Sequence, residues 1–218
     1  MAPFGKIYSY PGSWRVERAQ VAGAFNGLEV PYAEDFTMQE TNKTPEFLAK
    51  FPMGKVPAFE SATGYCVAES SAIARYVASK GPLAEQLLGS DPETRAKIDE
   101  WCFFTEGELT GHTNPVAYMV HYKFMPLDQA VVDRSTESFK RALAVVEAQL
   151  QKGENKTLLG GDKVTFADIT VALALVFSLG VVFGDDVLKG APNTVAWLKS
   201  LSEMKEFAAV SNWGKLKA

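Results

Sequence analysis

Hydrophobic and polar positions near the start of the chain follow first a strand pattern, then a helix pattern, then a strand pattern again. Residues 6–10 form a β-branched and aromatic run that a Pro-Gly pair stops, which predicts a strand and a turn. Small and apolar residues then recur at helical spacing over 16–25, with Ser13 as the N-cap and an Asn-Gly pair as the stop. Residues 28–33 restart as a strand. This order predicts a βαβ unit, whose crossover normally joins parallel strands.

The next segment predicts a short helix, a hairpin and a longer helix. A Thr-Pro-Glu sequence, typical of a helix N-terminus, opens a helix over residues 44–51. Residues 56–60 and 65–68 flank a four-residue connection that ends in glycine, which predicts two antiparallel strands. Apolar residues within 72–77 follow helical spacing, and we expect Ser70 to cap the helix that contains them.

Beyond residue 82 the strand patterns stop and long helices are expected. Four helices are predicted. The first begins at Asp91-Pro92-Glu93, and the second contains an apolar stripe over 131–150 between Asp128 at its start and Gly153 at its end. The third begins at Thr165-x-x-Asp168, the spacing of a capping box, and the fourth is an apolar run from about 194 to 201. The uncharged run over 169–184 is shorter than the ~20 residues needed to cross a bilayer, so it predicts a buried helix. We therefore expect a small α/β domain over 1–82 and an all-helical domain over 91–218.

Composition and charge exclude several classes of protein. The chain carries 22 Lys and Arg against 26 Asp and Glu, a net charge of −4, and 47% of its residues are hydrophobic, as in ordinary globular proteins. A negative net charge gives no sign of the Lys and Arg excess that binds the phosphates of DNA or RNA, so no nucleic-acid partner is expected. The N-terminus lacks a charged region followed by a long apolar stretch, so we expect no secretory signal, no membrane attachment and a cytoplasmic location.

Cysteine and histidine are scarce. Cys66 and Cys102 are too few and too far apart for a disulfide framework, and no Cys-x-x-Cys pair exists for redox chemistry or zinc. We expect both to be free cysteines that serve packing. His112 and His121 are nine residues apart, which would place them on opposite faces of one helix, and no metal site is expected.

Three strand-to-helix junctions carry candidate chemistry, and each also has a purely structural interpretation. Ser13 lies at a helix N-terminus that would stabilise an anion, but on local sequence a plain N-cap explains it without any further function. The bend at Val56-Pro57 can leave backbone groups available to an extended peptide, or can serve topology alone. Glu69 and Ser70 at the next junction suit an ammonium and a carboxylate, or a capped helix.

Aromatic residues gather in the first helices of the expected helical domain. They are Trp101, Phe103, Phe104, Tyr118 and Tyr122. Side chains of this kind can form the walls of a site for an apolar substrate, and packing in the core is the alternative.

These residues together resemble the cytosolic glutathione transferase superfamily, over essentially the whole chain. Within it, the likeness is strongest to the transferase-like domain of the gamma subunit of eukaryotic elongation factor one. The strings that carry it are Tyr10-Pro11-x-x-Trp14-Arg15, Thr41-Asn42-Lys43-Thr44-Pro45-Glu46-Phe47-Leu48, Phe51-Pro52-x-Gly54-Lys55-Val56-Pro57-Ala58-Phe59-Glu60, Val164-Thr165-Phe166-Ala167-Asp168-Ile169-Thr170-Val171 and Ala191-Pro192-Asn193-Thr194. The resemblance implies a thioredoxin-like N-terminal domain followed by an all-helical C-terminal domain.

The resemblance also implies a function and a set of site residues. It implies a transferase that conjugates glutathione to small electrophilic, apolar substrates, and as the alternative a non-catalytic scaffold of the elongation factor one complex. Glutathione is the implied co-substrate, with no metal, and a homodimer or an elongation-factor subunit is the implied partner. Ser13 is implied to activate the thiol, and Asp168 to be structural. The implied glutathione-binding residues are Arg15, Lys43, Lys55, Val56, cis Pro57, Glu69 and Ser70, and the aromatics assigned to the hydrophobic substrate site are Trp14, Trp101, Phe104 and Tyr118.

Overall fold

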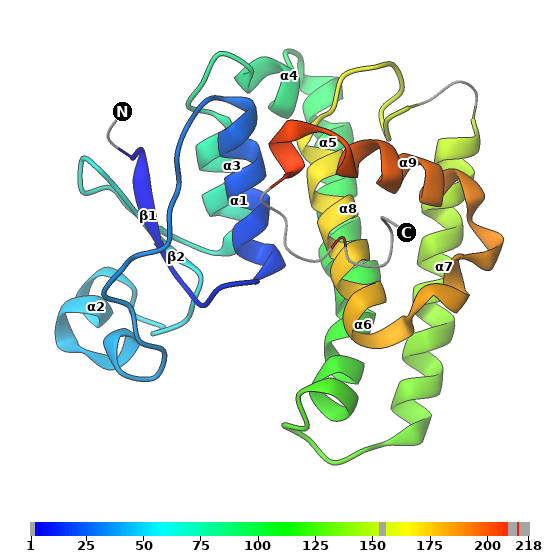
Figure 1. Cartoon of the computed structure of the whole chain (residues 1–218), viewed down its shortest axis with the longest axis horizontal. Helices are drawn as coiled ribbons and strands as arrows, with labels where there is room; N and C mark the ends of the chain where they lie inside the picture. Colours follow the sequence, from blue (N-terminus) through cyan, green and yellow to red (C-terminus); the bar gives the residue numbers. More distant parts are fainter. Residues whose placement is uncertain (1–2, 153–155, 209–212, 214–218) are drawn as a thin grey trace. The chain divides into compact units, whose positions relative to one another are not determined.

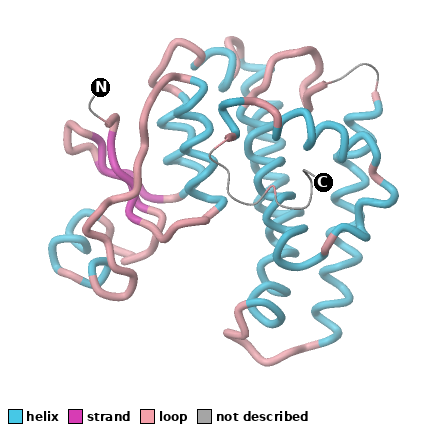
Figure 2. Tube along the Cα trace, viewed as in Figure 1, coloured by secondary structure: helices cyan, strands magenta, loops and turns pink. Residues whose placement is uncertain are grey.

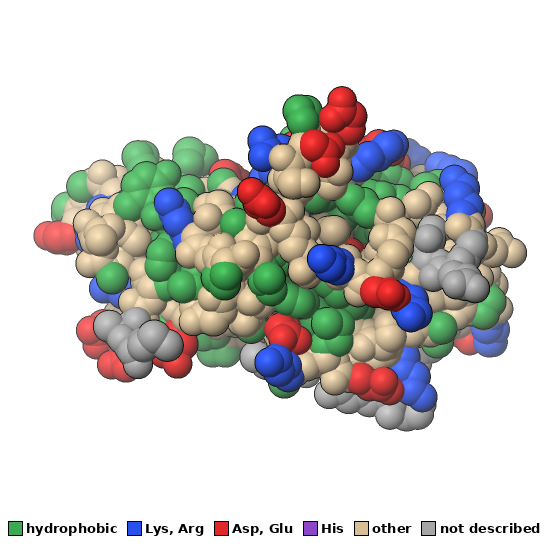
Figure 3. Space-filling model, turned by 90° about the horizontal axis from the view of Figure 1, so that it is seen from above, with side chains coloured by type: hydrophobic (Ala, Val, Ile, Leu, Met, Phe, Trp, Pro, Cys, Tyr) green, Lys and Arg blue, Asp and Glu red, His purple; other side chains and the backbone are tan. Residues whose placement is uncertain are grey.

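The computed structural model describes residues 3–152, 156–208 and 213. The chain folds as two compact units, Met1–Leu88 and Gly89–Ala218. All strands among the described residues lie in the first unit, and the second unit is built of helices (Figure 2). On the face shown in Figure 3, acidic and basic side chains are interspersed with apolar ones.

A three-stranded antiparallel sheet and two helices form the centre of the first unit. Strand β2 (Ala58–Ser61) pairs with β1 (Gly5–Tyr8) on one side and with β3 (Cys66–Ala68) on the other. The predicted hairpin is therefore confirmed. Helices α1 (Trp14–Phe25) and α3 (Ser70–Ala78) lie side by side next to the sheet (Figure 1), and their apolar faces are buried.

Residues 28–33 do not form a regular strand, contrary to the prediction. A single parallel bridge joins Ile7 to Tyr32. The Ile7 N–H donates to the carbonyl of Pro31 at 2.9 Å, and the Ala33 N–H donates to the carbonyl of Ile7 at 2.8 Å. The parallel crossover is thus present, but Pro31 has no N–H to donate, which limits the ladder to this bridge.

Shorter helices complete the first unit. Helix α2 (Pro45–Lys50) begins after a cap by Thr44, whose Oγ1 accepts from the Phe47 N–H at 3.2 Å, as predicted. Helix α4 (Ala84–Leu88) was not predicted. Its start is fixed by the buried side chain of Asn26, which donates to the Ala78 carbonyl at 2.9 Å and accepts from the Leu83 N–H at 2.9 Å.

The prediction that Ser70 caps α3 is wrong. Glu69 is the N-cap residue, and Ser70 is the first residue of the helix. The Ser70 hydroxyl instead accepts a hydrogen bond from Arg18 Nη2 at 2.8 Å. Because this partner lies on α1, far away in the sequence, local spacing carries no signal for it.

The second unit is a bundle of helices joined by short helical turns. Its elements are α5 (Pro92–Phe104), a π turn (Thr105–Leu109), α6 (Thr110–Val116), a π turn (Ala117–His121), α7 (Gln129–Gln151), α8 (Phe166–Ser178), a π turn (Leu179–Phe183), a 3-10 turn (Asp185–Gly190), α9 (Pro192–Ser202) and a 3-10 turn (Lys205–Phe207). Asp91 and Asp128 cap α5 and α7, as predicted, by accepting from backbone N–H groups at 2.8 and 3.2 Å. Gly153, the predicted end of α7, lies outside the described residues.

Helix α8 is the core of this unit, as predicted for the uncharged run. All of its residues are buried. By length and composition Phe166–Phe183 is apolar enough to cross a membrane, but 78% of this window is buried inside the protein, as in a core helix. The fully buried carboxylate of Asp168 accepts from the Leu158 N–H at 2.8 Å, the Thr165 N–H at 2.8 Å and Thr165 Oγ1 at 2.9 Å, so the predicted capping box is confirmed.

Glu147 on α7 joins that helix to the N-terminus of α9. Its carboxylate accepts from the backbone N–H and side chain of Asn193 at 3.0 and 2.6 Å, and from those of Thr194 at 2.8 Å each. Partial burial opposes ionisation, but these hydrogen bonds outweigh it and lower the pKa of Glu147. The carboxylate also lies at the positive end of the α9 dipole.

Glu147→Gln is expected to lower the free energy of unfolding by about 2 kcal/mol near neutral pH, since hydrogen bonds to a charged group are lost. Because the folded pKa lies below the unfolded value, this contribution is present above pH ~4.3 and disappears as the pH falls through the folded pKa. Urea unfolding of both proteins at several pH values measures the difference. Glu137→Gln, at a side chain that is 64% exposed on the same helix, serves as the control. A difference that persists unchanged in acid would contradict this assignment.

Candidate functional site

A cleft of about 210 Å³ in the first unit gathers residues from three separate parts of the sequence. It is lined by Arg15 of α1, by the segment that follows α2, and by the junction of β3 and α3. Most of the residues assigned to glutathione binding lie here: Arg15, Lys55, Val56, Pro57, Glu69 and Ser70. Ser13 and Lys43 are not among the residues that line it.

The backbone before β2 is bent at Val56-Pro57, whose peptide bond is cis, as the resemblance implies. The ladder between β2 and β3 begins at Ala58, which is opposite Ala68. Val56 therefore lies before the first paired residue of the ladder, and it lines the cleft. Such a segment can bind an extended peptide by backbone hydrogen bonds.

The junction of β3 and α3 holds Glu69 in an uncommon conformation. Its φ of 68° lies in the left-handed region, which for a residue other than glycine costs about 1–3 kcal/mol. The side chain is exposed at the cleft, next to the first turn of α3, where Ser70 contributes its hydroxyl. Backbone strain of this kind clusters at ligand-binding positions.

The charges that line the cleft suit a zwitterionic ligand with excess negative charge. Three cations, Arg15, Lys50 and Lys55, and one carboxylate, Glu69, are present. A carboxylate ligand is attracted by the cations, and an ammonium by Glu69. The cleft therefore has groups to bind both ends of an amino acid.

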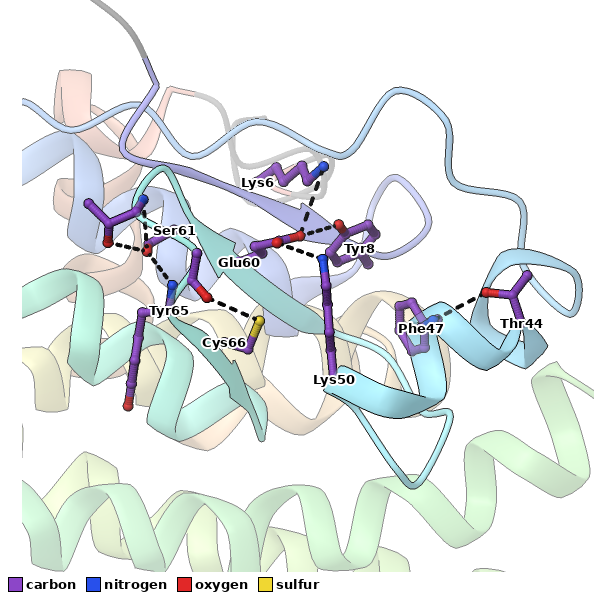
Figure 4. A network of polar contacts seen from close by, with 11 residues as sticks. Lys6, Tyr8, Thr44, Phe47, Lys50, Glu60, Ser61, Tyr65 and Cys66 are labelled. Carbon is purple, nitrogen blue, oxygen red and sulfur yellow. Dashed lines mark hydrogen bonds and ion pairs between the residues drawn. The ribbon is translucent and has the colours of Figure 1, made fainter.

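Lys50 is part of a polar network that the sequence did not predict (Figure 4). Its Nζ lies 2.6 Å from Glu60 Oε1, while the Tyr8 hydroxyl donates to Glu60 Oε2 at 2.6 Å. Lys6 Nζ lies 4.0 Å from the same oxygen. Hydrogen bonds from Lys50 and Tyr8 lower the pKa of Glu60, against the effect of partial burial. The charge of Lys50 is thus balanced by a neighbour on the sheet, which a pattern of local spacing cannot reveal.

Ser13 is the N-cap residue of α1, but its side chain makes no capping hydrogen bond. Its carbonyl accepts from the N–H groups of Val16 at 2.8 Å and Glu17 at 3.0 Å, and the residue is 5% exposed. The phenol of Tyr32 lies at the same junction, where burial raises its pKa and backbone N–H groups of Gly12 and Ser13 oppose the increase. Tyr32 is a neighbour of Ser13 that sequence reasoning missed.

The segment that contains Lys43 is tied to the loop that precedes Lys55. Buried Asn42 donates from Nδ2 to the carbonyl of Gly54 at 2.7 Å. A Cβ atom placed on Gly54 would lie 3.9 Å from Lys43 Nζ. Lys43 therefore lies next to the residue that precedes Lys55, although it is outside the lining of the cleft.

The three aromatics of the second unit that are assigned to a hydrophobic substrate site fall into two clusters. In the second unit, Trp101 and Phe104 make an edge-to-face contact at 5.4 Å and line a cleft of about 470 Å³ between α5 and α7. Tyr118 is 41% exposed and belongs to a different aromatic cluster, with Tyr122 and Phe124. Trp14, in the first unit, is 3% exposed.

Among the described residues, the cysteines and the side chains that commonly bind metals form no second candidate site. Cys66 and Cys102 are free, as predicted, and Cys66 packs against the core cluster around Phe47 and Phe51. Burial raises the pKa of the Cys66 thiol. Within residues 3–152, 156–208 and 213, no three His, Cys, Asp or Glu side chains come together in a way that could hold a metal ion.

The chain matches two family models, "Glutathione S-transferase, N-terminal domain" over residues 3–79 and "Glutathione S-transferase, C-terminal domain" over residues 112–204. It is 40% identical to a glutathione S-transferase-like protein from Fusarium sp, an alignment that covers 96% of this chain and 94% of that protein. It is 34% identical to elongation factor 1-gamma from Homo sapiens over 97% of this chain and 47% of that protein. The chain thus spans about half the length of this second relative.

A solved structure shows the same fold. Glutathione S-transferase I from maize, in complex with an atrazine glutathione conjugate, aligns with a TM-score of 0.80 and 30% sequence identity, over 96% of this chain and 98% of that chain. The expected fold, a thioredoxin-like domain followed by an all-helical domain, is confirmed, and so is the resemblance to both kinds of relative. The chain belongs to the glutathione S-transferase family.

Proposed function

We propose that this protein is a glutathione transferase that conjugates glutathione to small electrophilic, apolar substrates. The observation that carries the proposal is the cleft that unites Arg15, Lys55, Val56, Glu69 and Ser70. Glutathione is an extended tripeptide with one ammonium and two carboxylates, and this lining offers a partner for each of these groups. In this proposal the glutathione-binding domain is 1–82 and the all-helical domain is 91–218.

The cysteine residue and the γ-glutamyl group of glutathione each have assigned partners. The backbone of Val56 binds the cysteine residue, and Lys55 supports the same end of the cleft. Glu69 holds the γ-glutamyl ammonium and Ser70 donates to the γ-glutamyl carboxylate. Arg15, which lines the cleft, and Lys43, beside Gly54, are assigned to further contacts with the ligand.

Catalysis requires the thiolate of glutathione. A thiol of pKa ~8.5 is only about 3% ionised at pH 7, and lowering the pKa by about two units requires ~2.7 kcal/mol. A hydrogen bond from the Ser13 hydroxyl contributes ~1.5–3 kcal/mol and the α1 N-terminus ~0.3–1 kcal/mol. The thiolate sulfur then attacks an electrophilic carbon, a C–S bond forms, a leaving group such as chloride departs, and the thiol proton passes to solvent.

The remaining assignments complete the proposal. The aromatics Trp14, Trp101, Phe104 and Tyr118 bind the apolar substrate, and the protein acts as a cytoplasmic homodimer in detoxification. Trp101 and Phe104 have support from the cleft that they share in the second unit. No metal takes part in this mechanism.

A second candidate function is a non-catalytic scaffold of the translation elongation factor one complex. The identity of 34% to elongation factor 1-gamma, over 97% of this chain, favours it. A scaffold with this fold would bind an elongation-factor subunit, with or without glutathione. Turnover, rather than glutathione affinity alone, separates the two candidates.

Glu69→Gln is expected to weaken glutathione binding about 10- to 100-fold, because an ion pair with the γ-glutamyl ammonium is lost. Calorimetric titration with glutathione measures the change in Kd. Glu46→Gln is the matched control, because Glu46 is an exposed carboxylate of α2 that does not line the cleft. Equal affinities for the wild type and Glu69→Gln would remove Glu69 from the site.

A further inference from the structure

Arg18 is a buried cation that has no role in the mechanism proposed above. It lies on α1 with 0% exposure, three residues after Arg15, and its Nη2 donates to Ser70 Oγ of α3 at 2.8 Å. Its guanidinium lies 5.2 Å from the ring centroid of Trp14, which is itself buried. A charge is kept in a protein interior only where specific contacts compensate its loss of hydration. The fold therefore places this guanidinium directly behind a residue that lines the cleft.

The chemistry of the two groups fixes the direction of their hydrogen bond. A guanidinium has donors and no acceptor, so Ser70 Oγ is the acceptor in this contact. The hydroxyl proton of Ser70 is not used in this contact, so the hydroxyl can still donate to another group. Ser70 lines the cleft, so this proton is available to an acceptor bound there.

We infer that Arg18 is a positioning residue for ligand recognition, which orients the Ser70 hydroxyl as a donor to the γ-glutamyl carboxylate of glutathione. The inference rests on the proposed function, because it specifies how that site recognises one carboxylate. The buried charge of Arg18 also polarises the Ser70 hydroxyl, which strengthens its hydrogen bond to an anion. Arg18 itself does not touch the ligand in this assignment.

Two ligands distinguish positioning from a merely structural role. Calorimetry measures the Kd of glutathione and of 4-aminobutyryl-cysteinyl-glycine, which lacks only the γ-glutamyl carboxylate. Wild-type protein is expected to prefer glutathione by about tenfold or more. Arg18→Met is expected to reduce that preference about tenfold by weakening glutathione alone, whereas a general structural defect would weaken both ligands equally.

Two further variants complete the experiment. Ser70→Ala is expected to reproduce the loss of preference, and adding Arg18→Met to it is expected to change the Kd less than about twofold, because the two residues act through one contact. Arg141→Met is the control, since Arg141 also donates to a serine hydroxyl, Ser138 Oγ at 2.9 Å, but at an exposed position within α7. It is expected to leave both affinities unchanged.

Each outcome supports or overturns the inference. If Arg18→Met keeps the wild-type preference, or weakens both ligands equally, the inference is overturned and the proposed function stands. If wild-type protein does not bind glutathione, both are overturned. If Arg18→Met does not fold, Arg18→Lys decides in its place: a reduced preference supports the inference, and an unchanged preference overturns it.

Discussion

Ser13→Ala is expected to lower kcat/KM for glutathione conjugation near pH 7 by roughly 10- to 150-fold. The reason is the loss of one hydrogen bond to the thiolate, which contributes ~1.5–3 kcal/mol. The side chain makes no capping hydrogen bond to α1, so its hydroxyl is not committed to the helix. The expected loss is therefore catalytic, and the free energy of unfolding should change little.

The pH profile gives the Ser13 prediction a second readout. Without the hydroxyl, the thiol pKa rises, and the acidic limb of kcat/KM should move to higher pH by about one to two units. Ser9→Ala is the control, because Ser9 is equally buried, at 5% exposure, just before the same junction. An unchanged rate and profile for Ser13→Ala would remove this residue from catalysis.

Asp168→Ala is expected to lower the free energy of unfolding by about 3–5 kcal/mol. The substitution leaves three buried donors, on Leu158 and Thr165, without their acceptor, and each such loss costs about 1–3 kcal/mol. Urea unfolding monitored by circular dichroism gives the value. If the alanine variant does not fold, Asp168→Asn, which keeps one acceptor oxygen, is expected to be intermediate.

A nearby aspartate provides the control for Asp168. Asp162 is 77% exposed and pairs with Lys156 at 2.9 Å on the surface. Asp162→Ala is expected to change the free energy of unfolding by less than about 1 kcal/mol. If the two variants lose equal stability, the buried network around Asp168 is not what stabilises the start of α8.

The starts of α2, α5, α7 and α8 were predictable because their signals are local. The caps at Thr44, Asp91, Asp128 and Thr165 were all expected from side chains that reach backbone groups three residues onward, and all are present. The burial of helix α8 was also predictable, because its uncharged run has no charged side chains that require contact with water.

Features that depend on distant partners were not predictable. The segment at 28–33 is a separate case, because Pro31 within the segment itself limits its pairing with β1 to one bridge. Ser70 has the sequence context of a cap, yet its hydroxyl accepts from Arg18, across 52 residues of chain. Lys50 likewise meets Glu60 only once α2 has docked beside the sheet. The residues of the cleft were named from a family resemblance, whereas the contacts behind them required the fold.

Calorimetric titration with glutathione, with conjugation to chlorodinitrobenzene followed in the same wild-type sample, tests whether the protein is a glutathione transferase. We expect saturable binding and a conjugation rate above that of the uncatalysed reaction. Binding without turnover would contradict a transferase and favour the elongation-factor scaffold. If the protein shows no binding and no turnover, the assignment of the cleft as a glutathione site is contradicted.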